Sequence, residues 1–249
     1  MMALIMAAGV GNRLSGEFGG MPKALLSFGG RTLLERHLTE LRRIAVHDVV
    51  VAVGYKADLI AAELERLDAG ARVILAHNPD YQAGSVVTLQ AAAQALTCGD
   101  DILLMDADVL YDRRMLESLK RTRHRNCFLL DRSFEAGDEP MKLAVRGGQL
   151  VEFSRRVEAP FDFVGESVGF FRLAPPMAVA LSTANAALIE AGQRDEGYEE
   201  ALRRLLLHSP AGTFGFEDIT DLPWTEIDFP EDVVRAREEI LPRLIGEGG

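Results

Sequence analysis

A glycine-rich segment near the start of the chain carries residue types that bind phosphate. It follows an apolar run, and a lysine lies a short distance beyond it. Glycines let backbone N–H groups approach phosphate oxygens, and an arginine and a lysine offset the negative charge. We therefore expect this segment to hold a triphosphate through Ala7, Ala8, Gly9, Gly11, Asn12, Arg13 and Lys23.

The segment matches neither of two well-known phosphate loops. A P-loop would end in Gly-Lys-Ser/Thr, and a dinucleotide fingerprint would need a third glycine where this chain has Leu14. A tight strand-to-loop turn with incidental charges is the competing interpretation.

Two aspartates, Asp106 and Asp108, follow the apolar run 101–105. In an extended segment their carboxylates would point the same way. Magnesium binds one or two carboxylates together with waters and substrate phosphates, so the pair favours a Mg²⁺ site over helix capping or a solvated strand end. Asp228, shortly before Pro230, is a third candidate ligand, and helix N-capping is its competing role.

The first half of the chain alternates between strand and helix patterns. Strands are predicted over 3–8, 48–53, 72–76 and 101–105, and helices over 33–44, 56–67 and 86–96. Such alternation predicts a parallel sheet covered on both faces, with ligands bound beyond the carboxyl ends of its strands. The glycine-rich segment and the two aspartates follow such ends, so they should be neighbours.

The second half has a different pattern. Short strands are predicted over 127–130, 143–145, 150–153, 168–173 and 224–228, and helices over 177–191, 198–207 and 231–244. Several of these strands are bounded by turn residues, which predicts an antiparallel extension of the sheet. Because no composition shift marks a linker, residues 1–249 are expected to form one α/β domain with two lobes.

Composition limits the classes of function. The chain has 249 residues, 48% of them hydrophobic, which is enough for one sizeable core. Its net charge of −11 argues against a nucleic-acid partner. No apolar stretch approaches the ~20 residues of a membrane span, and two cysteines fit a reducing compartment, so a cytoplasmic protein without membrane contact is expected. The five histidines lack zinc-site spacing and are expected at the surface or in caps.

Three motifs, in this order, resemble the nucleotidylyltransferases that activate phosphorylated sugars and alcohols: Met6-Ala7-Ala8-Gly9-Val10-Gly11-Asn12-Arg13-Leu14 with Pro22-Lys23, then Asp106-Ala107-Asp108, then Glu226-Ile227-Asp228. The resemblance implies a Rossmann-like mixed, mostly parallel sheet with a small antiparallel acceptor lobe. Residues 1–125 would mainly bind nucleotide, and residues 126–249 would mainly bind the acceptor and supply the closing helix.

The resemblance also implies a reaction. A phosphate or phosphonate oxygen attacks the α-phosphorus of an NTP, and pyrophosphate is released. Arg13 and Lys23 would hold the triphosphate and the leaving pyrophosphate, and Asp108 and Asp228 would hold Mg²⁺. Asp106, assigned to the nucleotide site, would contact the metal through water or act behind the direct ligands. Arg13, Lys23 and Asp108 are the expected catalytic residues.

Within this superfamily the chain looks most like the phosphocholine cytidylyltransferase branch, which includes enzymes for 2-aminoethylphosphonate and inositol-1-phosphate. Asn78-Pro79-Asp80-Tyr81 followed by Gly84-Ser85 resembles the branch's base-contact segment, so CTP is expected to contact Gly84 and Ser85. Phosphocholine or 2-aminoethylphosphonate is the favoured acceptor. Its site would contain carboxylates for the nitrogen, cations for the phosphate and a cation–π wall, from Asp131, Glu139, Glu166, Lys142, Arg155 and Tyr198.

Other interpretations stay open. The acceptor-site charges could form a solvated rim, and the acceptor could be a sugar or inositol phosphate. A catalytically silent NTP sensor is a candidate of another class, although a sensor need not keep both metal carboxylates. A glycosyltransferase would not explain the glycine-rich segment. The expected partners are small molecules, and a homodimer is left open.

Overall fold

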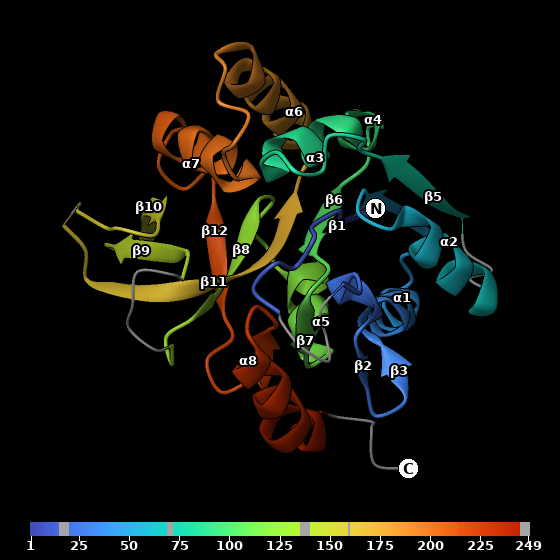
Figure 1. Cartoon of the computed structure of the whole chain (residues 1–249). Helices are drawn as coiled ribbons and strands as arrows, with labels where there is room; N and C mark the ends of the chain where they lie inside the picture. Colours follow the sequence, from blue (N-terminus) through green and yellow to red (C-terminus); the bar gives the residue numbers. More distant parts are fainter. Residues whose placement is uncertain (15–19, 69–71, 135–139, 159, 245–249) are drawn as a thin grey trace.

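The computed structural model describes residues 1–14, 20–68, 72–134, 140–158 and 160–244 (Figure 1). Within these ranges, nine strands form one mixed sheet whose main path runs β10-β9-β11-β6-β1-β4-β5, while β8 pairs with β11 and β12 pairs with β8. The strands are β1 (Met2–Ala7), β4 (Asp48–Val53), β5 (Arg72–His77), β6 (Ile102–Asp106), β8 (Cys127–Asp131), β9 (Lys142–Arg146), β10 (Gln149–Ser154), β11 (Phe163–Leu173) and β12 (Gly215–Asp218).

Strands β6, β1, β4 and β5 run parallel to one another, and β12 runs parallel to β8. Successive residues of a strand face opposite sides, so Leu4 enters one apolar cluster and Ala3 and Ile5 enter the other, all fully buried. Strand β11 runs antiparallel to β6 through its last residues and antiparallel to β9 through its first. The predicted α/β fold with a mixed, mostly parallel sheet is confirmed.

Helices cover both faces of this sheet (Figure 1). On one face lie α3 (Ser85–Ala91), α4 (Ala93–Leu96), α6 (Pro175–Glu190) and α7 (Tyr198–His208), and on the other lie α1 (Leu33–Arg43), α2 (Ala57–Arg66) and α5 (Arg114–Arg121). The helix predicted over 86–96 is divided because Ala92, at φ −100° and ψ 14°, leaves helical geometry. None of the helices described has the length and apolarity needed to cross a membrane.

A third apolar cluster packs the end of the chain against its first half. Here α8 (Pro230–Arg235) continues into a π-helical segment (Ala236–Ile240) and a 3₁₀ turn (Leu241–Arg243), where one helix over 231–244 was predicted. Val233 and Ile240 pack with Phe28 of the hairpin formed by β2 (Ser27–Phe28) and β3 (Arg31–Thr32).

A two-stranded sheet brings the acidic motif at residues 226–228 next to the acidic motif at residues 106–108. Strand β13 (Trp224–Glu226) pairs antiparallel with β7 (Val109–Tyr111), and the Ile227 N–H donates to the Asp108 carbonyl at 2.9 Å. The strand predicted over 224–228 ends at Glu226, so Asp228 lies just beyond it and before α8. Segments more than a hundred residues apart in the sequence therefore meet beyond the end of β6.

Candidate active site

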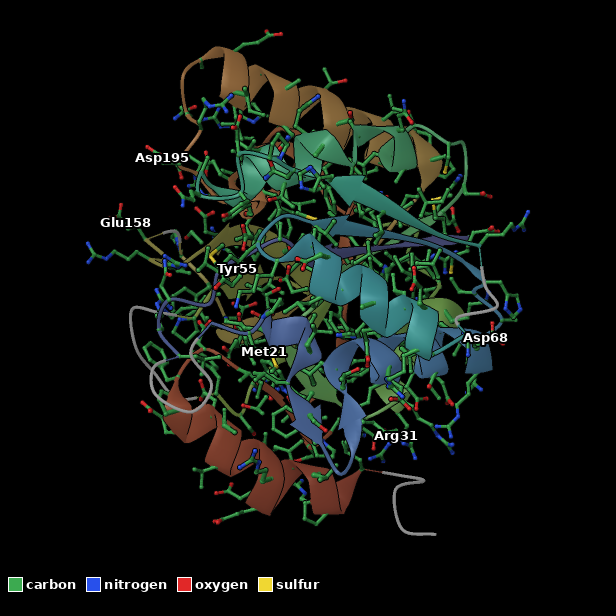
Figure 2. All side chains as sticks on the ribbon, turned by 45° about the vertical axis from the view of Figure 1, so that its right-hand side comes forward. Met21, Arg31, Tyr55, Asp68, Glu158 and Asp195 are labelled. Atoms are coloured by element: carbon green, nitrogen blue, oxygen red, sulfur yellow. The ribbon has the colours of Figure 1, made fainter. Side chains whose placement is uncertain are left out.

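The glycine-rich segment leaves β1 as a turn that is held at both sides. Tyr55, labelled in Figure 2, donates its backbone N–H to the Ala8 carbonyl at 3.1 Å, and the Leu14 N–H donates to the Gly11 carbonyl at 3.0 Å. Gly11 has φ +66°, and a Cβ there would lie 3.2 Å from the Lys23 side chain. Glycine at this position therefore permits both the turn and the close passage of Lys23.

Lys23 joins this turn to the acidic motifs. It begins a short 3₁₀ turn (Lys23–Leu25), and its Nζ donates to Asp108 Oδ2 at 2.8 Å and also to Asp228. Burial alone would lower the pKa of Lys23, but the two carboxylates outweigh burial and raise it above its usual value. The ammonium thus stays charged. Arg13 Nη1 lies 3.0 Å from Asp228 Oδ2, so both cations of the predicted phosphate site reach the same carboxylate.

Three carboxylates converge beside Lys23. Asp108, Glu226 and Asp228 each offer an oxygen, and these oxygens lie within 4.8 Å of one another. Hard divalent cations prefer such oxygen donors, so the donor set fits a Mg²⁺ ion. Glu226 was not among the predicted ligands. The sequence did contain a sign of this role: Glu226 lies two residues before Asp228, and side chains two residues apart can face the same way in an extended chain.

Asp228 is not the N-cap residue of α8. Its side chain pairs with Lys23 and Arg13, whereas Asp232 accepts the backbone N–H groups of Asp228 at 2.9 Å and Phe229 at 2.7 Å. The N-cap position of α8 belongs to Phe229, and Asp232 at the third helical position accepts its backbone N–H, so the N-cap role that competed with metal binding does not fall to Asp228.

The prediction that Asp106 and Asp108 point the same way assumed one extended segment, and the structure does not have it. Strand β6 ends at Asp106 and the chain turns at once, so the strand alternation stops there. The Tyr198 hydroxyl donates to both Asp106 oxygens, at 2.9 and 3.0 Å, and a Cβ on Gly169 (φ +77°) would lie 2.1 Å from one of them. Burial and the nearby Glu199 raise the pKa of Asp106 above its usual value.

Tyr198 does not form the expected cation–π wall. Its side chain is only 2% exposed, its ring packs edge-on against Phe171, and its hydroxyl is committed to Asp106. A ring buried at the start of α7 has no face open to a ligand. Tyr198 therefore orients Asp106 instead.

The predicted base-contact residues connect two helices. The Gly84 N–H donates to the Arg194 carbonyl at 2.8 Å, and Ser85 Oγ accepts the Tyr198 N–H at 2.9 Å. These bonds tie the start of α3 to the segment that leads into α7. Their contact with a nucleotide base remains a prediction.

A cavity of about 480 Å³ opens beside the carboxylates. This volume lies within the usual range for a small-molecule site. Its lining includes Arg13, Asp106, Glu226 and Asp228 and the predicted acceptor residues Asp131, Arg155 and Glu166. Ser167, Glu199 and Trp224 also line it and were not predicted. Lys142 is not in the lining. Its Nζ donates to the Arg155 carbonyl at 2.6 Å. Glu139 lies outside the described residues.

The carboxylates that line the cavity differ in their hydrogen-bond partners and in their pKa values. Asp131 accepts the Trp224 Nε1–H at 2.7 Å and the Ser133 N–H at 2.8 Å, so both its oxygens have protein donors. Burial and the charge of Asp131 raise the pKa of Glu166 to about 7, and burial raises the pKa of Glu199. A cationic group entering the cavity would favour the ionised forms of Glu166 and Glu199.

His37 corrects the expectation that the histidines are surface or capping residues. It is fully buried on the apolar face of α1, with Nε2 3.1 Å from the Ala107 carbonyl and Nδ1 3.3 Å from the Tyr111 hydroxyl. Burial lowers its pKa to about 4, so the ring is neutral near pH 7. Nε2–H then donates to Ala107, and Nδ1 accepts from Tyr111, which supports the turn before Asp108.

Comparisons with known proteins agree with this arrangement. The MobA-like NTP transferase domain matches residues 3–209. The chain is 28% identical over 242 residues to a bifunctional IPC transferase and DIPP synthase of Rubrobacter xylanophilus, covering 96% of this chain and 52% of that protein. It is 27% identical over 259 residues to a CMP-5'-(3-aminopropyl)phosphonate synthase of Streptomyces rubellomurinus, covering 96% and 39%.

The chain thus spans about half or less of the length of these curated relatives. Among solved structures, the inositol-1-phosphate CTP transferase from T. maritima matches with a TM-score of 0.74 at 20% identity, over 93% of this chain and 90% of that one. At this identity the match supports the fold alone. The domain match covers most of the sequence and includes the glycine-rich turn, Lys23 and Asp108. The chain belongs to the MobA-like NTP transferase domain family.

Proposed function

We propose that this protein transfers a cytidylyl group from CTP to the phosphate or phosphonate of a small amino alcohol, with phosphocholine and 2-aminoethylphosphonate as the favoured acceptors. One observation carries the proposal. Lys23 contacts Asp108 and Asp228 next to the glycine-rich turn, and Asp228 also lines an acidic cavity together with Arg13. Cations for a triphosphate, carboxylates for a metal ion and room for an acceptor thus occur together.

The chemistry needs positioning and charge neutralisation more than covalent help. An acceptor oxygen attacks the α-phosphorus, the bond from that phosphorus to the oxygen bridging to the β-phosphorus breaks, and pyrophosphate leaves. Arg13 and Lys23 would neutralise the triphosphate and the leaving pyrophosphate. The acceptor oxygen is already anionic, so the step requires no general base.

A divalent cation would complete the nucleotide site. Asp108 and Asp228, with Glu226 beside them, would hold Mg²⁺, and their spacing supports this role. When bound, the ion would supply further positive charge at the phosphate oxygens. Asp106 would act behind these residues, since its hydrogen-bond partner is Tyr198.

Support for CTP comes from the names of similar proteins. One relative is named as a CMP-phosphonate synthase, and one solved structure as a CTP transferase. Ala7, Ala8, Gly9, Gly11, Asn12, Gly84 and Ser85 are the residues proposed to contact this nucleotide. Mannose-1-phosphate guanyltransferases also match, at 26% identity over 185 residues, so the base is a point for experiment.

Support for an amine-bearing acceptor comes from the mixed charge of the cavity. Arg155 would face the phosphate end and Glu166 the nitrogen, with Asp131 as a further member of this lining. Glu139 and Lys142 stay predicted members, and Lys142 would act from behind Arg155, whose carbonyl it contacts. An inositol or sugar phosphate is the second candidate, favoured by the name of the T. maritima transferase. An NTP sensor is the non-enzymatic alternative.

A single assay separates these functions. Pyrophosphate release would be measured with each of four NTPs and with phosphocholine, 2-aminoethylphosphonate, inositol-1-phosphate and glucose-1-phosphate as acceptors. The expected result is Mg²⁺-dependent release with CTP and an amine-bearing acceptor. Fastest release with glucose-1-phosphate or inositol-1-phosphate would favour the second candidate. NTP binding without release for any pair would favour a sensor.

A further inference from the structure

We propose that Asp106, Ser167 and Glu199 form a subsite for a primary ammonium group, so that the enzyme accepts a primary amine in preference to a quaternary one. The inference rests on the proposed function and specifies its acceptor. All three residues line the cavity, and Ser167 and Glu199 were not among the residues predicted to bind the acceptor.

These three residues lie on the same face of the sheet. Ser167 pairs with Leu130, which belongs to the apolar cluster beneath α6 and α7. Asp106 reaches Tyr198 in that cluster, and Glu199 follows Tyr198 at the start of α7. By strand alternation, Glu166 and its partner Asp131 face the opposite side, where Trp224 donates to Asp131. The cavity therefore has two distinct sides. We place the nitrogen on the side of Asp106, Ser167 and Glu199, so Glu166 would act on it through its charge and not by direct contact.

Ser167 is the observation that points to a ligand. Its side chain is 8% exposed, and its Oγ has no hydrogen-bond partner within the described parts of the chain. Buried polar atoms nearly always have a partner, and an exception calls for one that is missing. Because Ser167 lines the cavity, a polar group bound there is the partner that would satisfy its hydroxyl.

The two carboxylates also lack an ion-pair partner among the described residues, and the charge of Arg155, which lines the same cavity, acts on Glu199 without pairing with it. Across the residues that the structure describes, neither Asp106 nor Glu199 forms an ion pair, and the side-chain donor to Asp106 is the neutral Tyr198 hydroxyl. By contrast, the partly buried Glu152 pairs with Arg203 at 2.7 Å. Negative groups withdrawn from water are costly when unpaired. A cationic ligand between Asp106 and Glu199 would remove that cost.

The type of cation follows from the hydrogen-bonding groups. A primary ammonium has three N–H donors, and this subsite offers two carboxylates and one hydroxyl as acceptors. A trimethylammonium has no N–H donor and is recognised by open aromatic faces. The aromatic rings on this side, Phe153 and Phe171, are fully buried and pack edge-to-face with other rings. They therefore leave no cage for methyl groups.

The first test compares two acceptors that differ only in three N-methyl groups. With CTP and Mg²⁺, kcat/KM for phosphoethanolamine should exceed that for phosphocholine by about tenfold or more, because the hydrogen bonds to charged acceptors would be lost with the quaternary amine. Equal or better turnover of phosphocholine overturns the inference and leaves the proposed function standing. A best acceptor without an amine overturns the inference and the proposed acceptor class together.

The second test removes the subsite one group at a time. Ser167→Ala and Glu199→Gln should each raise the KM for phosphoethanolamine, by about tenfold for Glu199→Gln, while the KM for CTP stays within about twofold. The exposed neighbour Glu196 provides a matched control, because Glu196→Gln should change neither constant. An unchanged phosphoethanolamine KM in folded Glu199→Gln protein overturns the inference.

A binding measurement tests the subsite without relying on catalytic turnover. Calorimetry would measure phosphoethanolamine binding to the protein with Mg²⁺ and a CTP analogue that carries a methylene between the α- and β-phosphorus. Wild type should bind phosphoethanolamine more tightly than phosphocholine, and Glu199→Gln should lose the difference. If no NTP and acceptor pair releases pyrophosphate, the proposed function fails and this inference fails with it.

Discussion

The Nζ of Lys23 lies 2.8 Å from Asp108 Oδ2, although 85 positions separate the two residues. The same ammonium also contacts Asp228, so Lys23 occupies carboxylates that a divalent cation would use. A metal ion and this lysine cannot both neutralise the same oxygens at full strength. We therefore expect Lys23 to turn from the carboxylates toward the triphosphate when Mg²⁺ and CTP bind.

Removing one carboxylate charge from the metal group should slow catalysis strongly. Asp108→Asn and Asp228→Asn should each lower kcat by about 10²-fold, a loss of roughly 2.7 kcal/mol of transition-state stabilisation, and should raise the Mg²⁺ concentration needed for half-maximal rate. Titrating Mg²⁺ at saturating substrates measures both effects. The exposed Asp58 on α2 supplies the control, Asp58→Asn. Wild-type Mg²⁺ dependence in Asp108→Asn would remove Asp108 from the metal site.

The two cations of the phosphate site should act on the nucleotide. Arg13→Ala and Lys23→Ala should raise the KM for CTP by about tenfold and lower kcat as well, because each removes charge that would offset the triphosphate and the leaving pyrophosphate. Initial rates over a grid of CTP and acceptor concentrations separate the two KM values. A defect confined to the acceptor KM would move these residues into the acceptor site.

Glu166 should make acceptor binding depend on pH. Its pKa of about 7 means that it becomes negatively charged as the pH rises from about 6 to about 8. A cationic acceptor should then bind more tightly, and its KM should fall by roughly threefold over that range. Because the acceptor phosphate can also titrate, Glu166→Gln measured with the same acceptor isolates the effect. Identical profiles for wild type and Glu166→Gln would contradict the prediction.

His37 should make the folded protein less stable in mild acid. Its pKa is about 4 in the folded state against about 6.5 in an unfolded chain, so below pH 6.5 the unfolded state binds a proton that the folded state does not. Stability is therefore full above pH 6.5 and declines as the pH falls toward 4, by about 2 kcal/mol at pH 5. Urea unfolding at several pH values measures this slope.

Two variants check the assignment to His37. His37→Gln keeps a donor for the Ala107 carbonyl but cannot titrate, so it should flatten the pH dependence below pH 6.5. His47 is exposed, and His47→Gln should leave the dependence unchanged. An equal slope in His37→Gln and wild type would mean that other groups cause the acid sensitivity.

The sequence located the strand ends better than the side-chain directions. The strand predicted over 48–53 matches β4 in full, and Lys23 and Asp108 meet because parallel strands deliver their carboxyl ends to one edge. The premise that Asp106 and Asp108 share one extended segment failed because a turn follows Asp106. Sequence periodicity holds no information about where a strand stops pairing.

Ser167 and His37 were missed for related reasons. The face of Ser167 is set by its pairing with Leu130 and by an irregular register between Ser167 and Phe171, both of which depend on long-range pairing. His37 lies on the apolar stripe of α1, where a histidine in a sequence gives no sign of the carbonyl it will meet. Such contacts are products of tertiary packing, so local patterns did not predict them.

Strand β11 limits how this protein could be cut or recombined. Its last residues pair with β6, while Phe170 and Phe171 enter the clusters on opposite faces of the sheet. A truncated chain that stopped before β11 would leave the backbone groups along one edge of β6 without partners and remove both aromatic rings from their cores. Open edges of this kind promote aggregation. Chimeras that exchange acceptor specificity between homologues should therefore keep β6 and β11 from the same parent.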